Sequence, residues 1–460
     1  MSISIAGRTT ITFAAAVVLA AGAGYLLVSP APKAIMLIGA LVVLALAVIA
    51  SEYPLAIFAA LAVLLGLYSE DPGDNLIPGK GAVWSSIVSG ITPAEVLLAL
   101  LVLAAVVARL SQKQSFPLWP GAPALAAAVL AATGIGSALV FHQVKDGLRG
   151  TQPSITLFLA LVSGYWLASR YGSRLLLFSL VAVSALLLPQ GLYNGFVLGR
   201  LSYYDASPIF LLGICSILVA FKVVDLAAWR LPYLVCAGLV IVLSLRRAIW
   251  IDIFVALAIT GLWSRRSGFR ALLAAGLGVV VVLELVSPGS AFSQIEHAVR
   301  YTTGAQGREF STDYRHWETA NAWINVKRHL VSGIGPDGEW TLYNSFDGRF
   351  RPYGFSYLHN SYLLVWLRLG LLGLAAYVAL FLTSIRMLLG RRLPLESIVV
   401  GAMMVGLAMA VYTASFLITG ARWPITVGLL LGIGLAAAAQ RRSEQSADEP
   451  AELHAANPSS

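Results

Sequence analysis

The sequence predicts an all-α polytopic membrane protein, with about 12–14 transmembrane helices and one large polar loop toward its C-terminal end. Of the 460 residues, 58% are hydrophobic and only 12% are charged, and the mean hydropathy is +0.81. Soluble domains do not have this composition. Apolar runs of membrane-crossing length recur along almost the whole chain, and they lack the strict alternation of membrane β-strands. Helical spans are therefore expected.

The candidate spans are the apolar runs themselves. The first run follows Arg8 and has the length of a full span, so we interpret it as an uncleaved first helix rather than a signal peptide. The candidate spans lie at roughly 11–29, 33–51, 53–69, 93–110, 121–141, 153–169, 174–190, 207–222, 231–246, 247–264, 271–287, 357–385, 396–417 and 422–440.

The distribution of basic residues predicts the orientation. With the N-terminus in the cytoplasm, the turns on that side carry 15 Lys and Arg residues and the short turns on the other side carry eight. Basic residues concentrate in cytoplasmic loops, so both ends are expected inside. The net charge of +9 suits contact with anionic membrane lipid. The basic residues are scattered between spans, which predicts no nucleic-acid partner.

Four segments follow from this pattern. They are 1–287 with the N-terminal transmembrane helices, 288–356 as a large periplasmic loop, 357–440 with the C-terminal transmembrane helices, and 441–460 as a disordered cytoplasmic tail. The loop carries seven basic, seven acidic and twelve aromatic residues. Within it, 311–330 is expected to form an amphipathic helix near the membrane surface. The Gly-Ile-Gly-Pro-Asp-Gly run at 333–338 predicts a turn.

Charges close to apolar runs need a physical reason. Arg246 and Arg247 lie between two runs with almost no loop. They form either a tight interfacial turn with snorkelling side chains or an anion site, since guanidinium groups bind phosphate oxygens bidentately. Asp252 is a candidate partner for Arg247. Glu95 and Arg109 lie near span ends and are expected to snorkel toward the interface.

His359-Asn360 is the most informative pair. It ends a long polar stretch and opens a hydrophobic run that continues for nine residues to Gly370-Leu371-Leu372-Gly373. One interpretation is a polar helix start with Asn360 as its cap. The other is a general base at the membrane boundary, because imidazole titrates near working pH with little tuning.

No cofactor is predicted. The remaining histidines show no metal-ligand spacing. Asp337-x-Glu339 alone is weak evidence for a cation site. Cys215 and Cys236 lie in apolar runs and indicate neither a disulfide nor a metal. Neither a nucleotide-binding loop nor a nucleophile elbow is present in the sequence, so an enzyme here would draw on a pre-activated substrate.

At this point the sequence resembles a known family. The run His359-Asn360-x9-Gly370-x2-Gly373 after a long outer loop is similar to the signature of the bacterial O-antigen ligase/polymerase family. Ser244-Leu245-Arg246-Arg247-Ala248 resembles the family's Ser-Arg-Gly run at a span end, and Arg247 matches its arginine. Gly199-Arg200-Leu201 followed by Ser207-Pro208 matches a Gly-Arg-Leu…Asn-Pro-Asn segment in part, because both Asn are absent.

The loop adds a further similarity. Arg315 and Trp317, followed by Gly333-Ile334-Gly335, resemble the family's run of Arg, Trp and then Pro-x-Gly-x-Gly, with Val331 in place of the Pro. The spacing from Arg to Trp differs, so either Arg308 or Arg315 is the equivalent arginine. The resemblance covers roughly residues 195–390.

The resemblance implies a GT-C-like integral glycosyltransferase of the bacterial inner membrane, working without a metal. It implies that a glycan moves from undecaprenyl diphosphate, at the periplasmic face, to the lipid A core in ligases or to a second lipid-linked glycan in polymerases. Arg200, Arg246, Arg247 and Arg308 or Arg315 would bind the diphosphate. His359 would take the acceptor proton, and Asn360 would orient the acceptor or the imidazole. Trp317, Trp340 and Tyr353 would stack on sugar rings.

Four functions remain open. A single large outer loop before the His motif favours an O-antigen ligase, which acts in lipopolysaccharide biosynthesis. A polymerase of O-antigen or exopolysaccharide is the nearest alternative, and a related branch that glycosylates protein hydroxyls is another. A transporter, for example of the bicarbonate type, also fits many spans and buried charges, but paired interrupted helices in two related halves are not visible.

Overall fold

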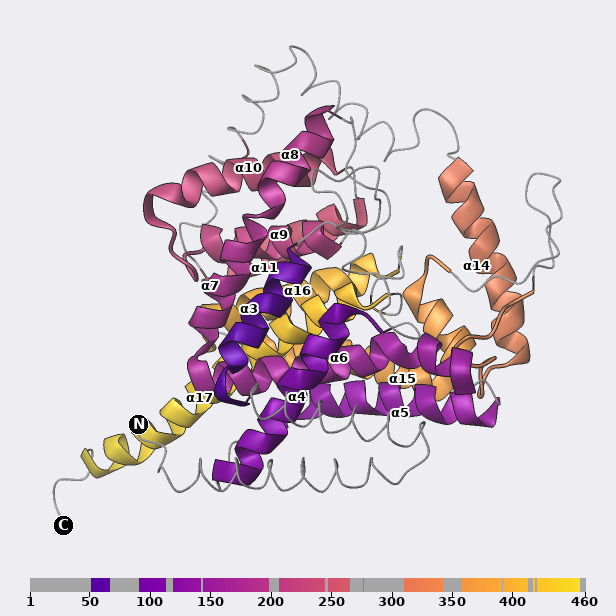
Figure 1. Cartoon of the computed structure of the whole chain (residues 1–460), viewed down its shortest axis with the longest axis horizontal. Coiled ribbons are helices and arrows are strands. Elements are labelled where there is room, and N and C mark those ends of the chain that lie inside the picture. The colour runs from indigo at the N-terminus through magenta and orange to yellow at the C-terminus, as the bar shows by residue number, and fades with distance from the viewer. Residues whose placement is uncertain are drawn as a thin grey trace, which may run out of the picture.

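The computed structural model describes residues 51–66, 91–112, 119–141, 144–197, 207–244, 247–264, 276, 310–341, 358–390, 392–412, 417 and 420–455. Throughout these residues the regular elements are helices (Figure 1). The predicted all-α fold class is confirmed. The candidate spans at 11–29 and 271–287, and almost all of 33–51, lie outside the described residues.

The described residues form fourteen helical elements. In chain order they are α3 (Pro54–Leu65), α4 (Pro93–Gln112), α5 (Ala122–Val140), α6 (Val144–Tyr171), α7 (Ser173–Ser184), α8 (Leu187–Val197), α9 (Ser207–Ala220), η2 (Ala227–Trp229), α10 (Arg230–Leu243), α11 (Arg247–Ser264), α14 (Phe310–Arg328), α15 (Ser361–Leu388), α16 (Leu395–Ala410) and α17 (Arg422–Ala455).

Several of these helices have the length and composition of membrane spans. Five stretches qualify among the described residues: Pro93–Leu110, Ala122–Val140, Ser173–Tyr193, Ser361–Leu388 and Arg422–Ser446. Five further apolar helices are shorter, at 10–17 residues. The protein is therefore a multi-pass α-helical membrane protein, as predicted.

Helix α17 forms the centre of the bundle and packs most extensively against α6. Glycines permit this close approach. A Cβ on Gly164 of α6 would lie 2.5 Å from the carbonyl oxygen of Leu429, and a Cβ on Gly428 of α17 would lie 2.7 Å from that of Leu157. Small residues spaced for direct backbone contact are the usual means of helix association in a membrane.

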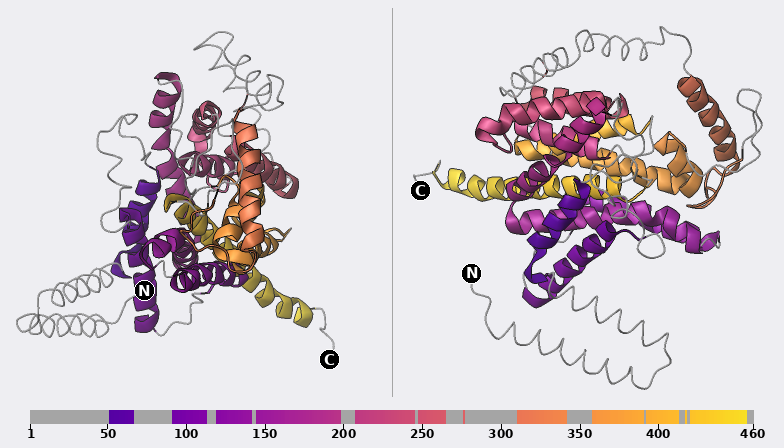
Figure 2. Two further views of the ribbon diagram at one scale, coloured as in Figure 1. Left: turned by 90° about the vertical axis from the view of Figure 1, so that its right-hand side faces the viewer. Right: turned by 45° about the horizontal axis from the view of Figure 1, so that its top comes forward.

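Helix α14 and the end of α17 lie at opposite ends of the molecule (Figures 1 and 2). Helix α14 packs beside α15 and corresponds to the helix predicted at 311–330. A turn follows at 333–338, where Gly333 and Gly335 have φ values of 68° and 95°. The predicted helix and the predicted turn are confirmed. The placement of the helix at the membrane surface stays a prediction.

The predicted disordered tail is wrong over most of its length. Helix α17 continues through Ala455 instead of ending near residue 440. The segment beyond residue 440 contains Glu, Gln and Ala, which favour helix. Arg441 and Glu444 form an ion pair of 3.2 Å along it. The polar composition marks where the helix leaves the bundle, and it does not mark where the helix ends.

Glu95 is not a snorkelling side chain. Its carboxylate is buried and accepts hydrogen bonds from the Thr92 N–H at 2.9 Å and from the Gln152 amide of α6 at 2.6 Å. The Thr92 hydroxyl in turn accepts from the Glu95 N–H at 3.4 Å. This reciprocal pair is a capping box. Glu95 therefore starts α4 and ties it to α6.

Candidate functional site

His359 and Asn360 lie at the first residues before α15. Asn360 is the N-cap of this helix, and its side-chain oxygen accepts a hydrogen bond of 3.1 Å from the Leu363 N–H. An amide at this position satisfies one of the donors that a helix start leaves unpaired. Asn360 thereby fixes the direction in which the chain enters α15, and with it the position of His359.

Helix α16 holds the same helix start from the other side. The Ser361 N–H donates to the Val411 carbonyl at 2.9 Å, and the Tyr362 hydroxyl donates to the Ala408 carbonyl at 2.8 Å. Both carbonyls belong to the last turn of α16 or follow it directly. The backbone beneath His359 is therefore anchored in the membrane bundle and not in a loop.

Glu318 binds His359 in two ways. The Nδ1 atom of His359 lies 2.9 Å from Oε2 of Glu318, and the same oxygen accepts the His359 backbone N–H at 3.1 Å. Glu318 projects from α14 and is 1% exposed, whereas the His359 side chain is 30% exposed. Because a carboxylate accepts hydrogen bonds, the proton belongs on Nδ1 and the lone pair on Nε2. The geometry suits a base supported by a buried carboxylate.

Aromatic rings surround this pair on the α14 side. Tyr314 lies four residues before Glu318 and so on the same helix face. Its ring meets the imidazole of His359 edge-on, with centroids 6.4 Å apart and planes at 87°. Trp317 packs against Tyr314 with centroids 5.3 Å apart. These rings restrict the orientation of the imidazole and border the site.

The glycines of the His motif form a break in α15. Gly370 has φ 67° and ψ −164° inside the helix, which is a backbone conformation reserved for glycine. The outer loop pairs with the main chain at this break. The Ile334 N–H donates to the Leu367 carbonyl at 2.9 Å, and the Leu371 N–H donates to the Val331 carbonyl at 3.2 Å. Nine residues separate Asn360 from Gly370. The contact between the loop and α15 therefore lies about two to three helical turns from His359.

Other contacts reinforce this docking. The Gly335 N–H donates to the Arg368 carbonyl at 3.1 Å, and the Trp366 indole N–H donates to the Leu330 carbonyl at 2.9 Å. The guanidinium of Arg368 is also attracted by the carboxylate of Asp337. The turn at 333–338 is therefore clamped to α15, which holds the preceding helix α14 and its Glu318 against His359.

The structure brings only some of the predicted site residues together. His359 and Trp317 belong to one cluster, with Asn360 directly beneath it. Arg315 lies on α14, is exposed, and has no ion-pair partner among the described residues. Arg247 begins α11, but its side chain is not described. The predictions for Arg200, Arg246, Arg308 and Tyr353 lie outside the described residues.

Trp340 does not suit the predicted stacking role. Its side chain is 1% exposed and is among the largest fully buried ones. The Asn325 side chain exchanges two hydrogen bonds with the backbone of Thr341, the residue after Trp340, at 2.8 and 3.1 Å. These bonds hold this part of the loop against α14. A ring that is covered by protein cannot stack on a sugar, so Trp340 acts as a core residue of the loop.

Glu318 is the residue that the sequence did not reveal. It lies 41 positions before His359, in a predicted helix that carries several charged residues. The sequence places the Glu318 carboxylate on the same helix face as Tyr314 and beside Trp317, which could have marked it as a site residue. The histidine that it contacts is revealed only by the packing of the loop onto α15. Among the described residues, three or more His, Cys, Asp or Glu side chains do not gather at any one point.

Apolar helices of membrane-crossing length, with a carboxylate of α14 held against a histidine at the start of one of them, define a multi-pass membrane protein with a polar site at a helix end. Residues 232–378 match the family model described as O-antigen ligase. For this segment, the match bears out the assignment to the O-antigen ligase/polymerase family that the motifs indicated. Comparison with curated proteins gives no match.

The matched segment runs from α10 to within α15, so it contains Glu318, His359 and the Gly370 break. The match supports a ligase- or polymerase-type function. It indicates a glycosyltransferase-like enzyme and, in general terms, lipid-linked glycans as substrates.

Proposed function

We propose that the protein transfers a glycan from undecaprenyl diphosphate to an acceptor hydroxyl of the lipid A core, as an O-antigen ligase of the bacterial inner membrane. The observation that carries the proposal is the contact between His359 and the buried carboxylate of Glu318 at the start of a span. A base at that place meets a lipid-borne substrate at the height of its head group. We place this end of the bundle at the periplasmic face, because the basic residues concentrate in the turns of the other face.

His359 acts as the base in this proposal. Its Nε2 lone pair takes the proton of the acceptor hydroxyl while the oxygen attacks C1 of the donor sugar. Glu318 holds the imidazole in the required tautomer and offsets the charge that the ring gains. Asn360 contributes by capping α15 and so positioning the histidine. A direct displacement of this kind inverts the anomeric centre.

The leaving group needs positive charge. The bond between C1 and the phosphate oxygen breaks, and the electron pair leaves with the diphosphate. Guanidinium groups stabilise such a developing anion. Arg200, Arg246, Arg247 and Arg308 or Arg315 are proposed for this role. Arg315 is supported by its exposed position on α14, one turn before Glu318.

The rings beside the base suit a glycan. Trp317 and Tyr314 border the site on α14, and aromatic faces are common partners of sugar rings. Because Trp340 is buried, we propose Trp317 as the residue that stacks on a sugar ring. Tyr353 is a second candidate for this role. The proposed reaction uses no metal.

A reconstituted transfer assay tests the proposal. The purified protein is mixed with undecaprenyl-diphosphate glycan and lipid A core in the presence of a chelator, and the glycan-bearing product is followed by mass spectrometry. We expect His359→Ala to lower the rate by about 10²–10⁴-fold. His316→Ala is the matched control, because His316 lies exposed on α14 and should leave the rate unchanged.

The alternatives separate in the same assay. If the glycan lengthens on its own lipid, the protein is a polymerase that uses the same residues. If His359→Ala transfers at the wild-type rate, the assignment of the base is wrong. If neither lipid acceptor is used, a protein acceptor or a transport function takes the place of the ligase proposal.

A further inference from the structure

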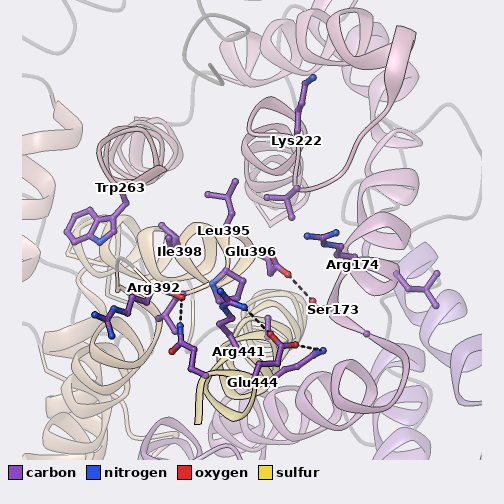
Figure 3. Close-up of a pocket in the computed structure, with 18 of the residues that line it drawn as sticks. Ser173, Arg174, Lys222, Trp263, Arg392, Leu395, Glu396, Ile398, Arg441 and Glu444 are labelled. Carbon is purple, nitrogen blue, oxygen red and sulfur yellow. Dashed lines mark hydrogen bonds and ion pairs between the residues drawn. The ribbon is translucent and has the colours of Figure 1, made fainter. Parts of the chain in front are cut away.

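A second candidate site lies at the far end of the helix bundle. A cavity of about 880 Å³ is lined there by the α6–α7 turn, the segment after α9, the end of α11, the α15–α16 turn and part of α17 (Figure 3). Helix α15 starts beside His359 and leads toward this cavity through 28 residues, a length of about 40 Å. The cavity is therefore distinct from the proposed transfer site.

The acidic residues of this cavity are already bound. Glu444 forms an ion pair of 3.2 Å with Arg441 on α17. Glu396 is buried at the start of α16 and accepts a hydrogen bond of 3.3 Å from the Ser173 hydroxyl. These two carboxylates are the acidic groups in the cavity wall. By formal charge, the four basic residues of the wall outnumber these two carboxylates, so the wall is net positive.

Three cations of the wall have no carboxylate partner among the described residues. They are Arg174 on α7, Lys222 after α9 and Arg392 before α16, and all three are exposed. They come from separate parts of the chain and lie on different sides of the cavity in Figure 3. Positive charges that repel one another across a cavity favour a bound anion.

The backbone at Lys222 supports a functional role for this side chain. Lys222 has φ 58° in the turn that ends α9, where the Val223 N–H donates to the Leu218 carbonyl at 2.9 Å. Glycine is the usual residue at such a helix end, because a side chain disfavours this conformation. The chain nevertheless places an ammonium group here, on the wall of the cavity.

The rest of the wall indicates what carries the anion. Leu175 is exposed and Leu393 and Leu395 are partly exposed, and together they form an apolar surface next to the cations. Tyr171 and Trp263 also line the cavity. Tyr and Trp are enriched at the level of lipid head groups. A small free anion would contact only the cations of the wall. A molecule with a phosphate group and a hydrocarbon chain would contact both the cations and the apolar surface.

We propose that this cavity binds the phosphate group of an anionic membrane phospholipid. Arg174 and Arg392 offer planar forks that match phosphate oxygens, and Lys222 adds a third positive charge. The hydrocarbon lies along Leu175 and Leu395. In the orientation proposed above, this lipid belongs to the cytoplasmic leaflet. The site is independent of the transfer chemistry at His359.

Native mass spectrometry of the purified full-length protein tests this site. The protein, in neutral detergent, is given equal amounts of phosphatidylglycerol and phosphatidylcholine. We expect retention of phosphatidylglycerol, and a fall of about tenfold or more in this preference for the double variant Arg174→Gln/Arg392→Gln. The matched control, Arg109→Gln/Arg386→Gln, removes two exposed arginines outside the cavity and should behave as the wild type.

Soluble competitors identify the source of the phosphate. Inorganic phosphate and glycerol 3-phosphate at millimolar concentration should leave the bound phosphatidylglycerol in place. Displacement by either one would overturn the lipid assignment. An unchanged preference in the cavity variant, or an equal loss in the control, would overturn the site itself. Both double variants change exposed side chains, and size-exclusion profiles equal to that of the wild type show that they fold.

Discussion

At the scale of single residues, the site depends on a division of tasks among three neighbours. In the proposed mechanism His359 carries the reactive nitrogen. Glu318 holds its ring through Nδ1, and Asn360 caps the helix below it. A polar side chain at a helix start often serves only as a cap. Here the cap is Asn360, which leaves the adjacent His359 to engage a buried carboxylate.

Replacing Glu318 tests this arrangement. Glu318→Gln keeps the shape and an acceptor for Nδ1 but removes the negative charge. We expect kcat to fall by about 10–100-fold, because a hydrogen bond to a charged group is worth about 1.5–3 kcal/mol. KM should change little, since Glu318 does not contact the substrate in the proposed mechanism. Steady-state transfer kinetics give both constants.

Glu339→Gln is the matched control for this substitution. Glu339 lies in the same loop and is exposed, so its loss should leave kcat and KM as in the wild type. A Glu318→Gln variant with wild-type kcat would show that the carboxylate does not support the base.

At the scale of elements, the break in α15 joins the outer loop to the membrane bundle. The segment 331–335 pairs with the main chain on both sides of Gly370, through Ile334 and Gly335 before it and through Val331 after it. A Cβ on Gly370 would overlap the carbonyl of Val331, and one on Gly333 would lie 2.5 Å from that of Arg368. Both positions therefore require glycine, because a side chain would block the close approach of the two backbones. Both residues also have a positive φ, which disfavours any other residue.

Gly370→Ala should undo this docking. An alanine here would cost about 1–3 kcal/mol of stability through backbone strain. Overpacking against the Val331 carbonyl would add a cost of similar size. We expect a markedly lower melting temperature in detergent and faster proteolysis of the 310–341 segment. Gly136→Ala is the control, because a Cβ there meets no atom within 4 Å and should be neutral or slightly stabilising. Equal melting temperatures for both variants would contradict the docking role.

A second helix contact lies below the site, between α11 and α16. Asp252 of α11 is 1% exposed, and neither oxygen of its carboxyl group has a hydrogen-bond partner among the described residues. Its backbone is pressed against Gly406 of α16. The predicted pairing of Asp252 with Arg247 remains a prediction, because the side chain of Arg247 is not described.

Gly406→Ala should destabilise this contact. The new Cβ would lie 2.5 Å from the Asp252 carbonyl oxygen and 2.8 Å from its Cα, both main-chain atoms. We expect a loss of about 1–3 kcal/mol of stability, and Asp252→Ala should fail to rescue it because the backbone remains in the way. Melting temperatures of the two single variants and the double variant form the test. Full rescue would show that the side chain alone limits the approach.

At the scale of the whole molecule, the two sites lie at opposite ends of the bundle. Helix α14 with Glu318 lies at one end, and the C-terminal half of α17 leaves the bundle at the other (Figures 1 and 2). Helix α15 leads from His359, through its break at Gly370, to Leu388, shortly before the turn that lines the cavity. Its 28 residues are enough to cross a membrane.

Cysteine labelling tests this arrangement. In a background with Cys215→Ala and Cys236→Ala, a membrane-impermeant maleimide should label His316→Cys from the periplasmic side of intact inner membranes. It should label Gln445→Cys only after the membranes are opened. His316 is exposed and Gln445 is partly exposed. Labelling of both from one side would contradict the proposed orientation.

Much of the fold follows from the sequence, because spans and loops differ strongly in hydropathy. The apolar runs and the helix at 310–328 are recognisable from composition and periodicity alone. The end of α17 is not, because a solvated helix of polar residues has the composition of a disordered tail. The burial of Glu95 and Trp340 also depends on partners that are distant in the chain, namely Gln152 for Glu95 and the packed loop around α14 for Trp340.

The sequence by itself determined the membrane class, the family and the identity of His359, since these depend on residue types and on spacing along one chain segment. Only the tertiary structure decided that Glu318 supports His359, that Gly370 receives the outer loop, and that three cations from separate segments share a cavity. Each of these contacts joins residues from different segments of the chain. Spacing along the sequence carries no signal for such contacts, because their positions are set by how the helices pack.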